Sequence, residues 1–275
     1  MKGFFQSKKR TEIMKNYAEN YILKAENVTV RYGVKAPAVN AASFEVKRGE
    51  FLLVVGENGS GKSSLVKGIL GLVPLTDGKI SFGGKDTERK IGYLSQGVDA
   101  DSNFPASVAE VVLSGFVGKK GLFSFYTRRD RRKVDEILDY LGIGKLRDKS
   151  FCALSGGERQ KVLLARALVS ATYCEPCREK GCTCHDETFC HTNGLIILDE
   201  PSNGLDPVAN KNLYATLARL NREKGMTVIM VSHLIESAIE YADKVLHMNK
   251  SVVFFGSADE YLATELGARF SKGCK

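Results

Sequence analysis

Short apolar runs predict the buried strands of this chain. They lie at residues 51–55, 195–198 and 227–231, and a glycine or polar residue follows each of them. A strand buried on both faces of a parallel sheet has such a continuous run, whereas a strand with one exposed face alternates. Residues 22–46 alternate and predict further strands near the N-terminus. This pattern is typical of an α/β protein.

Helical spacing follows the first of these runs. Leu65, Val66, Ile69 and Leu70 recur at helical spacing before Gly71, which can end a helix. Further strands are predicted at 79–82 and 91–94, and residues 245–248 and 252–256 predict a hairpin. Two more helices are predicted: one is capped by Ser107, with Glu110 as the second residue of a capping box, and the last is opened by 260–262.

A glycine-rich loop lies between the first strand and the first helix. Residues 56–63 read Gly-Glu-Asn-Gly-Ser-Gly-Lys-Ser and match the pattern G-x-x-x-x-G-K-[ST]. Glycines let successive amides turn toward one anion, Lys62 can reach the β- and γ-phosphates, and the Ser63 hydroxyl can reach Mg²⁺. The alternative to a phosphate-binding loop is a glycine loop that matches the pattern by chance. A chance match would not be expected to lie between a buried strand and a helix, as this one does. The candidate ATP-binding residues here are Gly56, Asn58, Gly59, Ser60, Gly61, Lys62, Ser63 and Ser64.

A second candidate anion site begins at Ser155. Ser155 and Glu158 form an S-x-x-E capping box, and an apolar helical face follows. Gly156 and Gly157 leave bare amides at the tip of this helix, where an anion can bind. The alternative is that this capping box only stabilises the start of a helix and binds no anion.

Two carboxylates end the second buried run. Asp199 and Glu200 lie at the carboxyl end of a predicted parallel strand, the edge at which α/β sheets bind ligands. Paired carboxylates at such a place are costly unless a cation or substrate uses them. Asp199 suits Mg²⁺, and Glu200 suits the polarisation of an attacking water molecule.

The loop at 56–63, the segment Leu-Ser-Gly-Gly-Glu-Arg-Gln at 154–160 and the run Leu-Ile-Ile-Leu-Asp-Glu at 195–200 together resemble the ABC-transporter ATPases. Residues 104–113 resemble the same segment of the ATPases that serve zinc and manganese importers, and the C-terminal hairpin with its last helix resembles the zinc-importer ATPases. The resemblance covers residues 21–262 and implies the ABC ATPase fold: a RecA-like mixed sheet core, an N-terminal antiparallel β subdomain and an inserted α-helical subdomain. The implied division is an extension at 1–20, the ATPase domain at 21–262 with its helical subdomain at about 97–162, a Cys/His-rich insertion at 171–194 and a tail at 263–275.

The resemblance assigns further roles. Tyr32 is expected to stack on adenine, Gln96 to reach Mg²⁺ and the attacking water, and His233 to contact the γ-phosphate. Asp206 is expected to couple two protomers, and Leu234 departs from the aspartate of many relatives. Two copies are expected to sandwich ATP between the loop of one and Ser155-Gly156-Gly157 of the other. Expected partners are multispanning permease subunits at the cytoplasmic face of the cell membrane and, indirectly, an extracytoplasmic metal-binding protein.

Composition and charge add one surface feature. Apolar residues make up 43% of the 275 residues, which is typical of a globular chain, and no run approaches 18 apolar residues or forms a secretion signal. Seven basic residues and Asp130 at 119–133 carry +6 of the net charge of +8. Because the charge is confined to this patch, a nucleic-acid partner is not expected. The patch is either a solvated helix face or a contact with anionic lipid headgroups.

A cysteine- and histidine-rich segment interrupts the pattern. Cys174-x-x-Cys177 has the spacing of half a structural zinc site, and tetrahedral Zn²⁺ needs four ligands. An iron–sulfur cluster and thiols without stable metal are alternatives, whereas disulfides are disfavoured in a reducing cytoplasm. Cys152 and Cys274 lie outside this group. The candidate ligands are Cys174, Cys177, Cys182, Cys184, His185, Cys190 and His191.

The expected function is ATP hydrolysis that powers import of a divalent transition metal, zinc first and manganese next. Alternatives are an importer ATPase for another substrate such as iron complexes, and a soluble ABC ATPase that acts on ribosomes or DNA. A non-hydrolytic metal-sensing module is disfavoured, because the catalytic residues form a complete set.

Overall fold

The computed structural model describes residues 21–83, 90–95, 105–117, 119, 125–173, 194–233 and 235–271. Its largest element is a six-stranded sheet with the order β5-β6-β7-β3-β8-β9. Five of these strands are parallel, and β9 pairs antiparallel with β8. The bounds are β3 Phe51–Val55, β5 Ile91–Leu94, β6 Leu195–Asp199, β7 Thr227–Val231, β8 Lys244–Asn249 and β9 Ser251–Ser257. The three predicted buried strands occupy the centre of this sheet, which confirms the α/β class.

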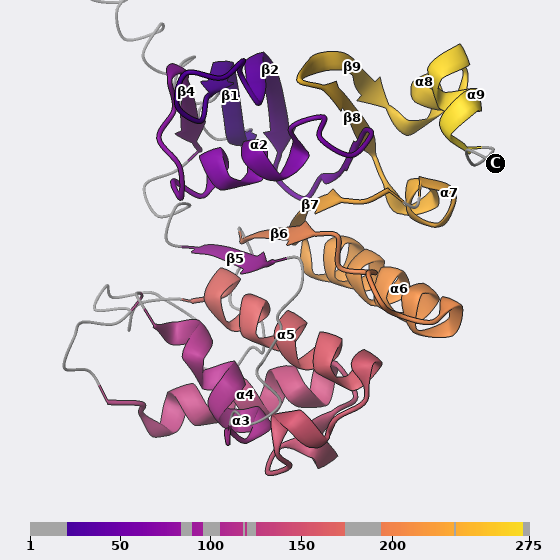
Figure 1. Ribbon diagram of the computed structural model, residues 1–275. Coiled ribbons are helices and arrows are strands. Elements are labelled where there is room, and N and C mark those ends of the chain that lie inside the picture. Colours follow the sequence, from indigo (N-terminus) through magenta and orange to yellow (C-terminus); the bar gives the residue numbers. More distant parts are fainter. Residues whose placement is uncertain are drawn as a thin grey trace, which may run out of the picture.

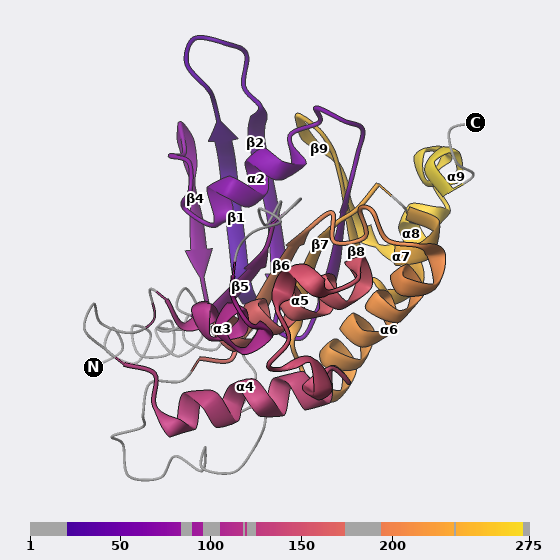
Figure 2. The same cartoon turned by 60° about the horizontal axis from the view of Figure 1, so that its bottom comes forward.

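A smaller antiparallel sheet lies at one end of the molecule (Figures 1 and 2). It has the order β2-β1-β4 and consists of β1 Tyr21–Val30, β2 Val39–Lys47 and β4 Asp77–Phe82. Helix α2, Lys62–Ile69, packs on it through Leu65 and Val66. Residues of β3 alternate between two hydrophobic cores. Leu52 and Val54 belong to the core shared with this sheet and α2, whereas Leu53 belongs to the core shared with the helices within residues 108–171 and 207–224. The mixed core and the antiparallel β part are therefore both confirmed.

The helical part lies at the opposite end (Figure 1). Helix α5 connects it to the sheet, because the Ser170 hydroxyl donates to the carbonyl of Ile91 in β5 at 3.0 Å. The buried residues of its apolar face pack against α3 and α4. The bounds are α3 Val108–Leu113, η2 Ser114–Phe116, α4 Arg128–Tyr140, η3 Gly144–Leu146, η4 Phe151–Ala153 and α5 Gly156–Ala171.

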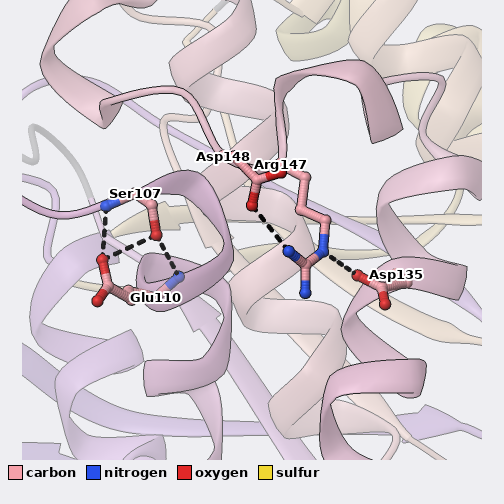
Figure 3. A network of polar contacts seen from close by, with 5 residues as sticks. All are labelled: Ser107, Glu110, Asp135, Arg147 and Asp148. Carbon is pink, nitrogen blue, oxygen red and sulfur yellow. Dashed lines mark hydrogen bonds and ion pairs between the residues drawn. The ribbon is translucent and has the colours of Figure 1, made fainter.

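Figure 3 shows how polar contacts hold this helical part together. The predicted cap of α3 is present: the Ser107 hydroxyl accepts from the Glu110 amide, and Glu110 Oε2 accepts from the Ser107 amide at 2.8 Å. Arg147 pairs with Asp135 of α4 at 2.6 Å and with Asp148 at 2.8 Å. The Arg147 carbonyl also accepts the Ala109 amide of α3 at 2.9 Å. The segment around Arg147 thus connects the start of α3 to the middle of α4.

The C-terminal region differs from its prediction. The sequence predicts a last helix that opens at 260–262, whereas α8 spans Ala258–Leu262 and a further helix, α9, spans Glu265–Ser271. Ser257 caps α8 in a capping box with Glu260, which explains the earlier start. The remaining helices are α6 Pro207–Lys224, α7 Ile235–Ala238 and η5 Ile239–Tyr241. Among the described residues, none of the helices has the length and apolar character needed to cross a bilayer.

A buried polar pair joins β8 to α8. His247 is 4% exposed, and its Nδ1 lies 2.8 Å from the Tyr261 hydroxyl, which is fully buried. Burial lowers the pKa of His247, and Lys62 adds to this effect while Glu57 opposes it. Burial also raises the pKa of Tyr261 to about 12. The folded chain therefore favours a neutral imidazole beside a protonated phenol.

Acid should destabilise the fold through His247. In the unfolded chain the pKa of His247 is about 6.5. Below that pH the unfolded chain binds a proton at His247 more readily than the folded chain does, so the free energy of unfolding falls as the pH falls. We expect the free energy of unfolding to decrease between about pH 7.5 and about pH 5.5, by at most about 1.4 kcal/mol per pH unit for this group. Urea unfolding of wild type and His247→Asn isolates the effect. Equal pH slopes in the two proteins would contradict it.

Candidate functional site

The glycine-rich loop is shaped by backbone contacts that exclude side chains. It connects β3 to α2, and Gly61 is the N-cap of α2 with φ 99°. A Cβ at Gly61 would collide with the Ala38 carbonyl, and one at Gly56, where φ is 145°, would collide with the Met248 carbonyl. Both positions therefore require glycine. The loop closes tightly, and the amides at the start of α2 are left free of a side-chain cap.

Lys62 is held within the loop. Its Nζ donates to the carbonyls of Gly56 at 2.7 Å and Glu57 at 2.9 Å, and only 5% of the residue is exposed. Burial lowers the pKa of the Lys62 ammonium, an effect that the carboxylates of Glu200 and Asp199 oppose. These contacts keep the ammonium at the centre of the loop, where a phosphate chain would lie.

Ser63 and Asp199 meet across the sheet edge. The Ser63 hydroxyl lies 3.4 Å from Asp199 Oδ1, although the two residues are 136 positions apart. Burial raises the pKa of Asp199, whereas the hydrogen bond from Ser63 lowers it. A buried carboxylate beside a hydroxyl is an oxygen donor set of the kind that Mg²⁺ prefers.

Glu200 points into the same site from a constrained backbone. It has φ 50°, in the left-handed region that non-glycine residues rarely adopt, and its amide donates to the Val231 carbonyl at 3.0 Å. Its Oε2 accepts from the Asn203 side chain at 2.6 Å and lies 3.8 Å from His233 Nδ1. The Glu200 side chain is 11% exposed and that of His233 is 47% exposed. A carboxylate held in this way is suited to orient a water molecule.

A single cavity of about 690 Å³ joins most of these groups. Tyr32 stands at its side, 46% exposed, and its hydroxyl donates to the Ser64 hydroxyl at 3.4 Å. Gln96 and the seven Cys/His candidates lie outside the described residues. The structure thus brings most of the other predicted phosphate-site residues together around one cavity, whereas Gly56, Ser60 and Asp199 do not line it. Its lining is Ala38, Asn58, Gly59, Gly61, Lys62, Ser63, Ser64, Glu200 and His233.

The second candidate anion site lies on a different surface. Ser155 caps α5, accepting from the Glu158 amide, and its amide and hydroxyl donate to Glu158, which lowers the pKa of that carboxyl. Ser155, Gly156 and Gly157 line a groove of about 510 Å³ beside the start of α6, and Gly157 faces Ala209 there. This groove and the phosphate-loop cavity have no lining residue in common.

Sequence reasoning missed several contributors. The carbonyls of Ala38 and Met248 fit against the loop glycines, and the Lys250 amide donates to the Ser60 carbonyl at 2.7 Å. These are backbone contacts, so no residue-type pattern announces them. Asn203 was not assigned a role either, although an amide three residues after a carboxylate in a tight turn could have indicated the contact with Glu200.

Comparisons with known proteins agree with this geometry. The family model described as "ABC transporter" matches residues 39–173. The chain is 37% identical to the zinc uptake system ATP-binding protein ZurA of Listeria innocua serovar 6a, over 88% of each chain. It is 33% identical to the manganese transport system ATP-binding protein MntB of Bacillus subtilis, over 88% of this chain and 89% of that one. It also resembles cbiO1 of Clostridium perfringens, part of the complex cbiONQ, with a TM-score of 0.72 and 29% identity over 91% and 94% of the two chains.

Proposed function

The chain belongs to the ABC transporter family, and from this premise we propose that it is the ATP-hydrolysing subunit of an importer for a divalent transition metal, zinc first and manganese next. Relatives named for zinc and manganese uptake support the choice of metal. Other relatives are named for phosphonates and for chelated iron, so the ATPase site itself does not select the substrate. Selection belongs to partner subunits.

The observation that carries the mechanism is the separation of the two anion sites. The phosphate-loop cavity lacks any lining residue from 155–157, and the groove at Ser155 lacks any from the loop. Family members work as dimers with membrane permeases, so a second copy can supply what each cavity lacks. We infer that ATP lies between Lys62 of one copy and Ser155 of the other.

The residues divide the chemistry between charge neutralisation and alignment. Lys62, the loop amides and His233 neutralise the γ-phosphate, and Ser63 with Asp199 would hold Mg²⁺, which adds positive charge when bound. Gln96 would join them, by the family resemblance. Glu200, fixed by Asn203, orients the attacking water. Tyr32 stacks on adenine at the open side of the cavity.

Hydrolysis then separates the two copies. The nucleotide bridges the dimer only while its γ-phosphate spans both sites, so its loss shifts the pair toward the open state. A multispanning permease at the cytoplasmic face of the cell membrane converts this closure and opening into alternating access. An extracytoplasmic metal-binding protein delivers the ion to that permease.

Purification of the tagged chain from membranes of its own cells tests this role. We expect a multispanning protein to co-purify, and expect the reconstituted complex to hydrolyse ATP faster when its metal-binding protein carries Zn²⁺ than when that protein is metal-free. Co-purification of ribosomes or DNA in place of a membrane protein would contradict the proposal. Stimulation by an organic substrate but not by Zn²⁺ or Mn²⁺ would contradict the choice of metal.

We also propose that the Cys/His-rich insertion binds structural or sensory Zn²⁺ through four of its seven candidate ligands. What the structure contributes is the position of its ends. The chain leaves α5 beyond Tyr173 and returns at Gly194, where a Cβ would lie 2.5 Å from the Ala171 carbonyl. The ends are therefore adjacent, at the amino end of β6 and away from the sheet edge that holds Asp199.

Metal analysis of purified protein tests the insertion. We expect about one zinc ion per chain, lost when Cys174 and Cys177 are both replaced by serine, because tetrahedral zinc needs all four ligands. Cys152→Ser is the matched control, since Cys152 is a half-buried cysteine outside the insertion, and this variant should keep the metal. Protein that contains no metal after purification under reducing, zinc-replete conditions would refute the site.

A further inference from the structure

The start of α4 presents a strongly basic surface. Arg128, Arg129, Arg131 and Arg132 are all exposed, and we call these four residues the arginine face. The helix turns Val134 and the residues one turn further along it into the core, which leaves the arginines on its outer side. Both views place α4 at the edge of the molecule far from β1, β2 and β4 (Figures 1 and 2).

These charges are not neutralised within the described part of the chain. None of the four arginines forms an ion pair with another described residue, whereas nearby Arg147 pairs with two carboxylates (Figure 3). The acidic residue between them, Asp130, is buried and accepts from the Thr127 amide and hydroxyl in a capping box. Four positive charges therefore face solvent within little more than one helical turn.

Exposed apolar side chains lie beside the arginine face. Phe125 is 91% exposed and Tyr126 is 38% exposed, and both immediately precede the cap of α4. The ring of Tyr126 lies 6.4 Å from the ring of Phe116, which brings the segment at 116–117 close to Tyr126. Val117, which follows Phe116 in the chain, is 71% exposed. Large apolar side chains this exposed are costly in water unless another phase or partner covers them.

We infer that the arginine face, with Phe125 beside it, binds the anionic phospholipid surface of the membrane. Guanidinium groups bind phosphate in a bidentate manner, and an aromatic ring next to them fits the boundary between headgroups and acyl chains. A nucleic acid would use the charges equally well but would not account for the exposed aliphatic Val117. Because it concerns a surface outside both nucleotide cavities, the inference goes beyond the proposed function and does not depend on the transported substrate.

The experiment is flotation of the full chain with vesicles. We expect binding to vesicles that contain phosphatidylglycerol and not to vesicles of phosphatidylcholine alone, with binding that weakens as salt is raised. Replacing the four arginines by glutamine should lower the partition coefficient by up to about a thousandfold, since each of the four charges contributes about 1 kcal/mol near an anionic surface. Phe125→Ser should lower it further, including at high salt.

A matched variant separates the patch from net charge. Lys47, Lys79, Lys211 and Arg222 are exposed on other elements, and replacing them by glutamine removes the same charge. This control should keep wild-type vesicle binding, and both variants should keep ATP turnover, which shows that they fold. Equal loss in the two variants, equal binding to both vesicle types, or tighter binding to a single-stranded RNA oligonucleotide than to phosphatidylglycerol would each overturn the inference.

Discussion

Replacing Glu200 with glutamine should stop ATP turnover and leave ATP binding intact. Glutamine keeps the shape and an oxygen that can accept from Asn203, so the turn with its left-handed backbone should remain. The charge that polarises the attacking water is lost, however, and a positioned general base contributes about a hundredfold to ten-thousandfold. Steady-state phosphate release should fall by this factor, while nucleotide affinity measured by calorimetry should change little.

The same variant should accumulate the closed pair. If hydrolysis opens the dimer, a chain that binds ATP without cleaving it should double its mass in the presence of Mg-ATP, as measured by light scattering. Glu223→Gln is a suitable control, because that exposed carboxylate lies on α6 outside both cavities, and it should retain turnover. Wild-type turnover in Glu200→Gln would remove this residue from its assigned role.

Replacing Ser155 with aspartate should abolish turnover without unfolding α5. Aspartate caps a helix about as well as serine, so the helix should still begin at Gly156. Its negative charge would stand where the partner's γ-phosphate must approach, and it would also repel Glu158, which now accepts from Ser155. Loss of one such stabilising contact typically costs about a hundredfold to a thousandfold in rate.

Ser155→Asn is the neutral counterpart of this change. Asparagine caps a helix as well as aspartate and has nearly the same shape as aspartate, but it carries no charge. The asparagine variant should therefore retain far more turnover than the aspartate variant. ATP binding to the phosphate loop should survive in both variants, since Ser155 does not line that cavity. Equal activity of the aspartate and asparagine variants would show that no phosphate approaches this helix tip.

The parts of the fold that follow from burial could be predicted from the sequence. The run at 51–55 became a fully buried central strand, and the capping boxes at Ser107 and Ser155 formed as their spacing indicates. Burial and capping are local consequences of residue type, which explains this success. The start of α8 could also have been found, because Ser257 and Glu260 have the same capping spacing.

The geometry within the site could not be predicted in the same way. The 3.4 Å contact of Ser63 with Asp199 depends on how α2 and the end of β6 lie at one sheet edge, and the sequence indicated only that both residues suit Mg²⁺. The contact of Asn203 with Glu200 depends on a left-handed residue in a short turn. Backbone carbonyls that shape the loop leave no trace in residue type. The roles of Gln96 and of the Cys/His-rich insertion stay predictions.

The central claim is that two copies of this chain trap the nucleotide between them. Its most direct test is the structure of Glu200→Gln bound to Mg-ATP. We predict a symmetric pair in which each triphosphate contacts Lys62 of one copy and Ser155 of the other. A single copy whose own Lys62 and Ser155 both touch one triphosphate, or a triphosphate bound away from both residues, would contradict the account.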